Sequence, residues 1–401
     1  MNRRLADWLD AYMQFTNNSE APELFRKWTG VSVLAAALQR KCFLEWGSLT
    51  FYPNMYIVLV APTGKRKGTA MGPGGRLLRE LGIKIAAEAI TREALIRELR
   101  NSNDTAIDPL TGKMELHSSL TVFSEELTVF LGYNNYQLMS DLANWYDCGS
   151  EWTYRTKTQG TDKIIGVFVN LLGATTPQLL QSTLPVDAIG GGLTSRMIFV
   201  SEEKKGKIVP FPFLSEDERV LGDNLKRDLE KIHMMIGQYR FTEDFLDLWV
   251  DWYTSQEGHP PFNDEKLSGY IERRPTHAMK LSLIMSASSG NSMILRATDL
   301  ERSIKLLEAT EVKMPTTFSG IGRSPIAIIL PKIMAYIATK REVTLAELLQ
   351  VFSSDVDSFI LETRVLRTLE ASNYIKVVHT NLGKVVTYTG MVKETTNEEH
   401  N

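Results

Sequence analysis

The stretch that decides the fold is Met55-Tyr56-Ile57-Val58-Leu59-Val60-Ala61-Pro62-Thr63-Gly64-Lys65-Arg66-Lys67-Gly68-Thr69. Its first six residues form a continuous apolar run, which is typical of a strand buried on both faces of a parallel sheet. A loop rich in Gly, Lys and Thr follows, and residues 69–80 after it are predicted to be a helix. Strand, loop and helix in this order form the context in which backbone N–H groups bind a phosphate.

The loop matches the spacing of the phosphate-binding pattern G-x-x-x-x-G-K-[ST]. The separation from Ala61 to Lys67 equals that from the first glycine to the lysine of the pattern. We therefore expect Lys67 to contact the terminal phosphates of a nucleotide, and the sequence predicts an ATPase.

Three positions depart from the pattern. Ala61 and Arg66 replace its two glycines, and Gly68 stands where the hydroxyl residue that binds Mg²⁺ is usual. We expect Thr69 to replace it as metal ligand, and Lys65 is a second candidate for the phosphate contact. The alternative is an ordinary Gly- and Lys-rich turn between strand and helix. The predicted nucleotide-binding residues are Ala61, Pro62, Thr63, Gly64, Lys65, Arg66, Lys67, Gly68 and Thr69.

Two acidic residues follow the next predicted strand, Ser119–Phe123. A P-loop needs one carboxylate on a neighbouring strand to hold the metal and another to orient the attacking water. We therefore assign Glu125 to the metal, through its water shell, and Glu126 to the catalytic base. The alternative is a pair of solvated acids at the end of a strand.

Two further predicted strands, at 164–172 and 196–200, each adjoin one candidate catalytic residue. Thr175 follows the first, where its hydroxyl would contact the γ-phosphate or the water; alternatively it belongs to the turn before Pro177. Arg196 follows three glycines, and such an arginine in an oligomer reaches the γ-phosphate bound by a neighbour. Alternatively, Arg196 pairs with a carboxylate of its own chain. Weaker candidates for a second phosphate sensor are Arg273, Arg274 and Lys280.

The pattern divides the chain into six segments, which are an N-terminal helical segment at 1–40, an α/β core at 41–214, a helical lid region at 215–314, a linker at 315–325, a winged-helix domain at 326–392 and a disordered tail at 393–401. Thr298 and Glu301 predict a capping box. Further expected elements are strands at 42–46 and 83–87, helices at 24–38 and 91–100, a loop or hairpin at 102–113, C-terminal helices at 331–340, 344–352 and 357–372, and C-terminal strands at 374–379 and 384–389.

The chain has 401 residues, a net charge of −3 and two cysteines without metal-ligand spacing. This composition fits a reducing compartment and argues against a disulfide scaffold or a zinc module. The N-terminus shows no apolar leader, and no stretch reaches the roughly 20 apolar residues of a membrane span. We expect a cytoplasmic protein without membrane contact.

Several motifs together resemble phage and mobile-element replicative helicases, a family with a RecA-like or AAA+-like P-loop ATPase core that has long been catalogued as a domain of unknown function. The resemblance covers roughly residues 20–310. Its motifs are 22–28, 53–64, 66–70, Tyr146-Asp147-Cys148-Gly149, 172–177 and Gly192-Leu193-Thr194-Ser195-Arg196.

The resemblance implies a ring-forming motor, a hexamer, that binds ATP and Mg²⁺ and moves on single-stranded DNA. Lys67 would be its P-loop lysine, Glu125 and Glu126 its acids, and Arg196 its arginine finger. Nothing resembling a primase precedes the ATPase, so a separate primase and a single-strand-binding protein are expected replisome partners. A phage-encoded chain would act in the cytoplasm of a bacterial host.

Candidate DNA contacts lie in two places. Tyr154–Thr158 is a possible loop against the DNA backbone, through Arg155 and Lys157, or a solvated hairpin. In the predicted winged helix, Arg364 and Arg367 lie on the third helix and Lys384 near the wing, although acids there roughly match bases. Two rivals to a helicase stay open: a helicase loader or replication initiator that binds origin DNA through the winged helix, and a nucleotide-binding switch or scaffold with weak hydrolysis.

Overall fold

The computed structural model describes residues 3–108, 111–156, 160–184, 189–318, 325–380 and 383–390. The chain forms two compact units, Met1–Phe318 and Ser319–Asn401. Both contain helices and strands, and the largest sheet is mixed, so the α/β class is confirmed. The first unit joins the three segments that the sequence separates into N-terminal helices, core and helical lid region.

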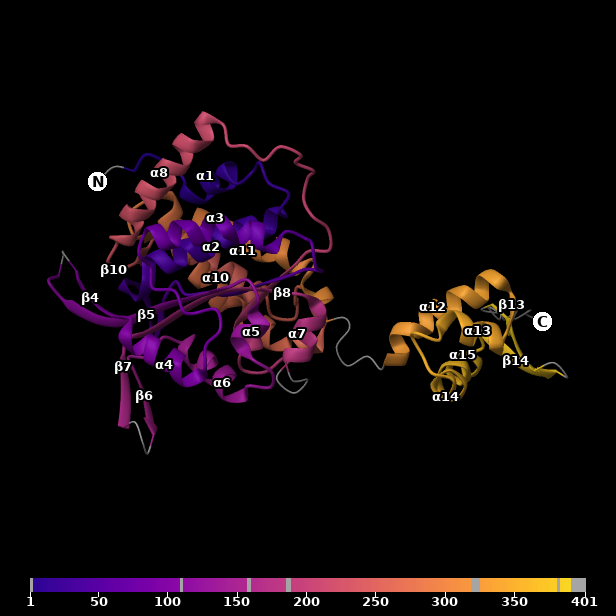
Figure 1. Cartoon of the computed structure of the whole chain (residues 1–401). Helices are drawn as coiled ribbons and strands as arrows, with labels where there is room; N and C mark the ends of the chain where they lie inside the picture. Colours follow the sequence, from indigo (N-terminus) through magenta and orange to yellow (C-terminus); the bar gives the residue numbers. More distant parts are fainter. Residues whose placement is uncertain are drawn as a thin grey trace, which may run out of the picture. The chain divides into compact units, whose positions relative to one another are not determined.

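A five-stranded sheet forms the centre of the first unit (Figure 1). Its order is β4-β5-β8-β3-β9, where the bounds are β4 Asn103–Ile107, β5 Met114–Ser124, β8 Val167–Thr175, β3 Tyr56–Val60 and β9 Met197–Ser201. The neighbouring strands β5, β8, β3 and β9 run parallel to one another. The edge strand β4 is antiparallel to β5. The sequence predicted the parallel strands, and its uncertain region at 102–113 is the β4–β5 hairpin.

The two central strands are buried along their whole length, which explains their continuous apolar sequences. One polar side chain within them, Asn170 of β8, is satisfied on both sides. Its Oδ1 accepts a hydrogen bond from the backbone N–H of Met55 at 3.1 Å, and its Nδ2 donates to the carbonyl and hydroxyl oxygens of Ser32. A buried amide with these partners fixes the position of β8 against β3 and the neighbouring helix.

Helices cover both faces of the sheet (Figure 1). On one side lie α1 Trp8–Phe15, α2 Glu23–Leu38, α3 Lys67–Glu80 and α8 Glu216–His233, and on the other α4 Arg92–Asn101, α5 Leu127–Leu131, α6 Tyr136–Trp145 and α7 Pro177–Thr183. The helices α9 Glu243–Ser255, α10 Ser268–Ser289 and α11 Ala297–Glu311 complete the unit. Thr91 caps α4 as predicted, because its side chain accepts from the Ala94 N–H.

Shorter elements connect these layers. They are β1 Cys42–Trp46, β2 Leu49–Phe51 and β10 Gly237–Gln238 in one sheet, the β6 Glu151–Thr156 and β7 Gly160–Ile165 hairpin, the pair β11 Arg240–Phe241 and β12 Ile294–Leu295, and the 3₁₀ turns η1 Gln39–Lys41, η3 Thr194–Arg196, η4 Glu265–Leu267 and η5 Met314–Phe318. Among the described residues, no helix is both long and apolar enough to cross a membrane.

Four local predictions are wrong. The expected strand at 83–87 is only an isolated bridge from Ile85 to Thr121. The run 164–172 is split between β7 and β8 because Gly166 adopts a left-handed φ of +61° and its backbone approaches Leu116 too closely for a side chain. Helix α11 begins before the predicted capping box, and Asp299 accepts from the Arg296 N–H instead. Residues 315–318 of the predicted linker belong to η5, whose Phe318 packs against Phe199.

The second unit contains three helical segments and a three-stranded antiparallel sheet of order β13-β15-β14. Its elements are α12 Pro325–Lys340, β13 Glu342–Thr344, α13 Leu345–Phe352, the helical run of α14 Ser358–Ile360, η6 Leu361–Leu366 and α15 Arg367–Ala371, and the strands β14 Ile375–Thr380 and β15 Gly383–Tyr388. The first helix starts six residues before the predicted Pro331, and the third has a π-helical middle at η6. The predicted tail at 393–401 lies outside the described residues.

Close packing of α3 on α2 predicts the effect of two glycine substitutions. A Cβ at Gly74 would lie 2.6 Å from a methyl of Thr29 and 2.9 Å from a methyl of Val33, whereas a Cβ at Gly72 meets no atom within 4 Å. We expect Gly74→Val to lower the free energy of unfolding by about 1–3 kcal/mol through overpacking. Gly72→Ala, the control, should change it by less than about 1 kcal/mol, because the gain in helix propensity is opposed by the contact of the new Cβ with Pro73, the next residue. Urea unfolding followed by tryptophan fluorescence reports on the first unit, which contains all seven tryptophans. Equal changes in the free energy of unfolding for the two variants would contradict the close packing of α3 on α2.

A buried histidine predicts loss of stability in acid. His277 accepts from the Tyr146 hydroxyl at 3.0 Å, donates to the Ser195 carbonyl at 3.3 Å, and burial lowers its pKa to about 3. Since the unfolded chain takes up this proton near pH 6.5, stability is complete above that pH and falls as the pH drops toward 3, by at most roughly 1.4 kcal/mol per pH unit.

The same fluorescence measurement at pH 7, 6, 5 and 4 tests this prediction. His277→Gln should flatten the dependence without removing it, because burial also lowers the pKa values of His117 and His233. A slope unchanged in the variant would show that His277 is not held neutral.

Candidate functional site

The predicted phosphate loop joins the end of β3 to the start of α3. Two of its residues have left-handed backbones, Gly64 with φ +80° and Arg66 with φ +64°. Arg66 occupies the position where the pattern has glycine, so the backbone there retains the conformation that favours glycine and accepts a side chain at some strain. The peptide N–H of Ala61 donates to the Thr175 carbonyl at 3.3 Å and ties the loop to the neighbouring strand.

Lys67 is the first residue of α3, and its side chain turns back over the loop. Its Nζ donates to the carbonyl oxygens of Ala61 at 2.7 Å and Pro62 at 3.3 Å. Partial burial lowers the pKa of this ammonium, and the charge of Glu126 opposes that shift. A cation at a helix N-terminus whose hydrogen bonds go to neutral carbonyls can exchange those partners for an anion.

Sheet order brings the other candidates to the same edge. Strand β8 lies between β3 and β5, and parallel strands end at one edge of a sheet, so Thr175 lies between the loop and the two acids. Thr175 is buried, and its hydroxyl donates to the carbonyl of Thr176 at 3.3 Å. Glu125 and Glu126 are exposed just beyond the end of β5.

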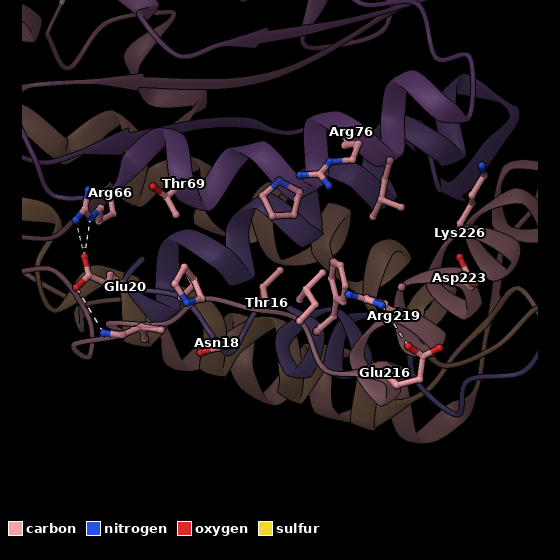
Figure 2. A pocket seen from close by; sticks show the side chains of 18 of the residues that line it. Thr16, Asn18, Glu20, Arg66, Thr69, Arg76, Glu216, Arg219, Asp223 and Lys226 are labelled. Atoms are coloured by element: carbon pink, nitrogen blue, oxygen red, sulfur yellow. Dashed lines mark hydrogen bonds and ion pairs between the residues drawn. The ribbon is translucent and has the colours of Figure 1, made fainter.

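Gly68 and Glu125 are in close contact. A Cβ at residue 68 would lie 2.6 Å from Oε2 of Glu125, so the carboxylate occupies the space that a serine or threonine side chain would need. The glycine that replaces the usual serine or threonine at position 68 therefore leaves the space that the Glu125 carboxylate fills. Thr69, predicted as the substitute metal ligand, instead lines a cavity together with Arg66 and Pro73 (Figure 2).

This cavity, of about 940 Å³, is the site feature that sequence reasoning missed. It extends along α3 and is walled by residues 15–20 between α1 and α2, by residues 209–214, and by α8 (Figure 2). At one end Glu20 accepts from Arg66 and from Lys205, both at 2.8 Å, and these cations lower its pKa to about 2. No short motif could reveal this network, because its members are 46 and 185 residues apart.

Arg196 lies at the opposite end of the strands, where β3 and β9 begin. It directly precedes β9, whose first residue, Met197, pairs with the first residue of β3, whereas the loop follows the last residue of β3. Its guanidinium donates to Asp147 at 2.7 Å and to the Gly192 carbonyl at 2.6 Å. Arg196 thus pairs with a carboxylate of its own chain, as the alternative interpretation predicted. It cannot contribute to the phosphate loop of the same chain.

The weaker phosphate-sensor candidates have partners within the chain. Arg274 is buried and pairs with Glu311 at 2.6 Å, and Lys280 is buried with its ammonium donating to Asn54 at 2.7 Å. Both are therefore closed to a nucleotide, and that prediction is wrong for them. Arg273 lies 3.5 Å from the carboxylate of Asp147, the residue that also binds Arg196.

The predicted DNA-binding residues lie on three separate elements. Arg155 is on β6 of the β6–β7 hairpin and donates to the Thr161 hydroxyl at 3.0 Å, and Lys157 lies outside the described residues. In the second unit, Arg364 and Arg367 are exposed on the third helical segment. Lys384 pairs there with Glu362, which partly neutralises it.

The loop has a lysine, a helix N-terminus and a nearby pair of acids, and the described residues contain no cluster of three or more His, Cys, Asp or Glu side chains that could hold a metal alone. A search of protein-family models found no matching family, and a search of curated proteins found no match. The functional assignment therefore depends on the geometry.

Proposed function

We propose that this protein binds ATP with Mg²⁺ at Ala61–Thr69 and hydrolyses it. The observation that supports the proposal best is the position of Lys67. It lies at the N-terminus of α3, at the end of the sheet where β8 finishes with Thr175 and where Glu126 follows β5. A lysine, helix-terminal N–H groups and a carboxylate at one site suit phosphoryl transfer to water. The order of the strands, with β8 between β3 and β5, suits the P-loop core expected from the sequence.

Each residue has a distinct role in this proposal. Lys67 exchanges its loop carbonyls for the terminal phosphates, and Glu126 accepts the proton of the water whose oxygen attacks the γ-phosphorus as the bond to the β–γ bridging oxygen breaks. Thr175 is buried, so its hydroxyl would have to leave the Thr176 carbonyl and open to the site before it could orient that water. Bound Mg²⁺ would neutralise phosphate charge. Glu125, which occupies the space beside Gly68, is the candidate ligand, because the predicted ligand Thr69 lines the cavity instead.

The work that hydrolysis drives is proposed to be DNA unwinding by a homo-oligomeric ring, a hexamer. Arg196 supports assembly, since it can act only on a nucleotide bound by another copy, after exchanging Asp147 for a phosphate. A second candidate is a loader or initiator that binds duplex origin DNA. It is favoured by the second unit, whose order of helices and strands fits a winged helix with exposed Arg364 and Arg367.

A third possibility, a nucleotide-dependent switch with weak hydrolysis, is supported by the left-handed backbone of Arg66. Mass photometry with and without ATP and DNA separates a hexamer from smaller assemblies. Forked-duplex unwinding tests the motor, and preference for duplex over single-stranded DNA would favour the initiator.

Lys67→Ala should abolish ATP-dependent unwinding and lower the rate of ATP hydrolysis by roughly 10²–10³-fold, as expected for loss of one group that stabilises transition-state charge. Phosphate release and forked-duplex unwinding measure the two effects. Lys65→Ala checks the register, because Lys65 lies two residues earlier in the loop and its loss should have the smaller effect. Unwinding that survives Lys67→Ala, or a larger loss with Lys65→Ala, would refute this phosphate-loop assignment.

Glu126→Gln should slow hydrolysis by roughly 10²–10⁴-fold while ATP binding is retained, because the amide cannot accept the proton. Glu125→Gln should instead weaken binding in the presence of Mg²⁺ and have little effect on binding without it. Calorimetric titration with ATP, with and without Mg²⁺, distinguishes the two variants. If both variants lose the same step, the separate roles of the two acids are wrong.

A further inference from the structure

The cavity beside α3 begins where the phosphate loop ends. Arg66, the last residue of the loop, and Thr69, in the first turn of the helix, both line it (Figure 2). Its volume of about 940 Å³ lies within the range of small-molecule sites, about 300–1,000 Å³. None of the roles assigned so far uses this space.

The two sides of the first helical turn differ in what they face. Gly68 faces the carboxylate of Glu125, whereas Thr69, about 100° further round the helix, faces the cavity. The terminal phosphates belong beside Lys67 and the acids. The other end of a triphosphate chain must then leave on the side away from Glu125, which is the side on which the cavity opens.

We propose that this cavity holds the nucleoside half of a nucleoside triphosphate whose phosphates bind at the loop. The inference rests on the proposed function and adds to it a site for base and ribose built from residues 15–20, the outer face of α3 and residues 209–214. A subsite of this kind makes the protein a nucleotide-selective phosphate binder rather than one that accepts any polyphosphate.

The walls have the chemistry that a heterocycle and a sugar require. Apolar surface comes from Phe15, Pro73, Leu77, Val209 and Pro212, which lie on three segments around the space. Asn18 supplies a polar group at the wall, and its Nδ2 donates to the Phe213 carbonyl at 3.0 Å, which holds residues 209–214 in place. Eight charged side chains also line the cavity, so only its apolar stretch suits a flat ring, and the polar stretches suit the ribose.

Glu20 connects this cavity to the phosphate loop. Its carboxylate accepts from the Arg66 guanidinium, from the Lys205 ammonium at 2.8 Å and from the backbone N–H of Val209 at 3.5 Å. One acid therefore ties the loop, the segment after β9 and the cavity wall to one another. A nucleotide that extends from the loop into the cavity would pass beside Glu20 and its partners.

Binding of Mg²⁺-ATP and of Mg²⁺-tripolyphosphate, measured by isothermal titration calorimetry, tests the inference. Val209 lines the cavity, whereas its neighbour Ile208 is 76% exposed and does not. The wild-type protein should bind ATP at least about tenfold more tightly than tripolyphosphate, because only ATP fills the cavity. Val209→Trp should remove most of that difference and leave tripolyphosphate affinity within about twofold, and the matched control Ile208→Trp should change neither affinity.

The outcomes separate the inference from the function on which it rests. Equal wild-type affinities for ATP and tripolyphosphate, or equal losses for both in Val209→Trp, would overturn the nucleoside site while the phosphate loop stands. No binding of either compound by the wild type would overturn the proposed function and the inference with it. Thermal unfolding followed by tryptophan fluorescence confirms that both tryptophan variants are folded.

Discussion

The insertion of β8 between β3 and β5 is the constraint on which the candidate site depends. The loop and the two acids are far apart in sequence. They lie at the same end of the sheet only because β3, which precedes the loop, and β5, which precedes the acids, both pair in parallel with β8. Asn170 stabilises this arrangement from within, since its amide joins β8 to the start of β3 and to α2. Loss of the pairing would separate Lys67 from Glu126 while leaving each local motif intact.

Much of the sheet follows from sequence because strands buried on both faces have continuous apolar runs. Residues 55–60 and 119–123 are of this kind, and the structure contains both strands. The run 164–172 was misread because apolar character does not show a backbone reversal, and only the close approach of Leu116 reveals why Gly166 ends one strand and precedes another. Helix ends set by single side chains, such as Asp299, are equally hard to distinguish from nearby alternatives.

The candidate site was predictable to the extent that it is local. Ala61–Thr69 and the two acids follow strands directly, so their positions could be inferred from the strands. The role of Gly68 could not be inferred, because the residue that fills its space is 57 positions away in sequence. The cavity was equally hidden, since its walls come from segments between α1 and α2, along α3 and before α8, and composition gives no signal of their meeting.

The chain leaves the first unit beside the strand that neighbours β3. At η5, Phe318 packs edge-on against Phe199 of β9 with ring centres 4.8 Å apart, the Thr317 hydroxyl bonds that of Ser201, and Lys313 pairs with Glu202 at 2.7 Å. Tension applied at Phe318 is therefore carried first to β9, and from β9 through five paired residues to β3, whose end leads into the proposed phosphate loop. The last turn of the first unit is thus mechanically linked to that loop.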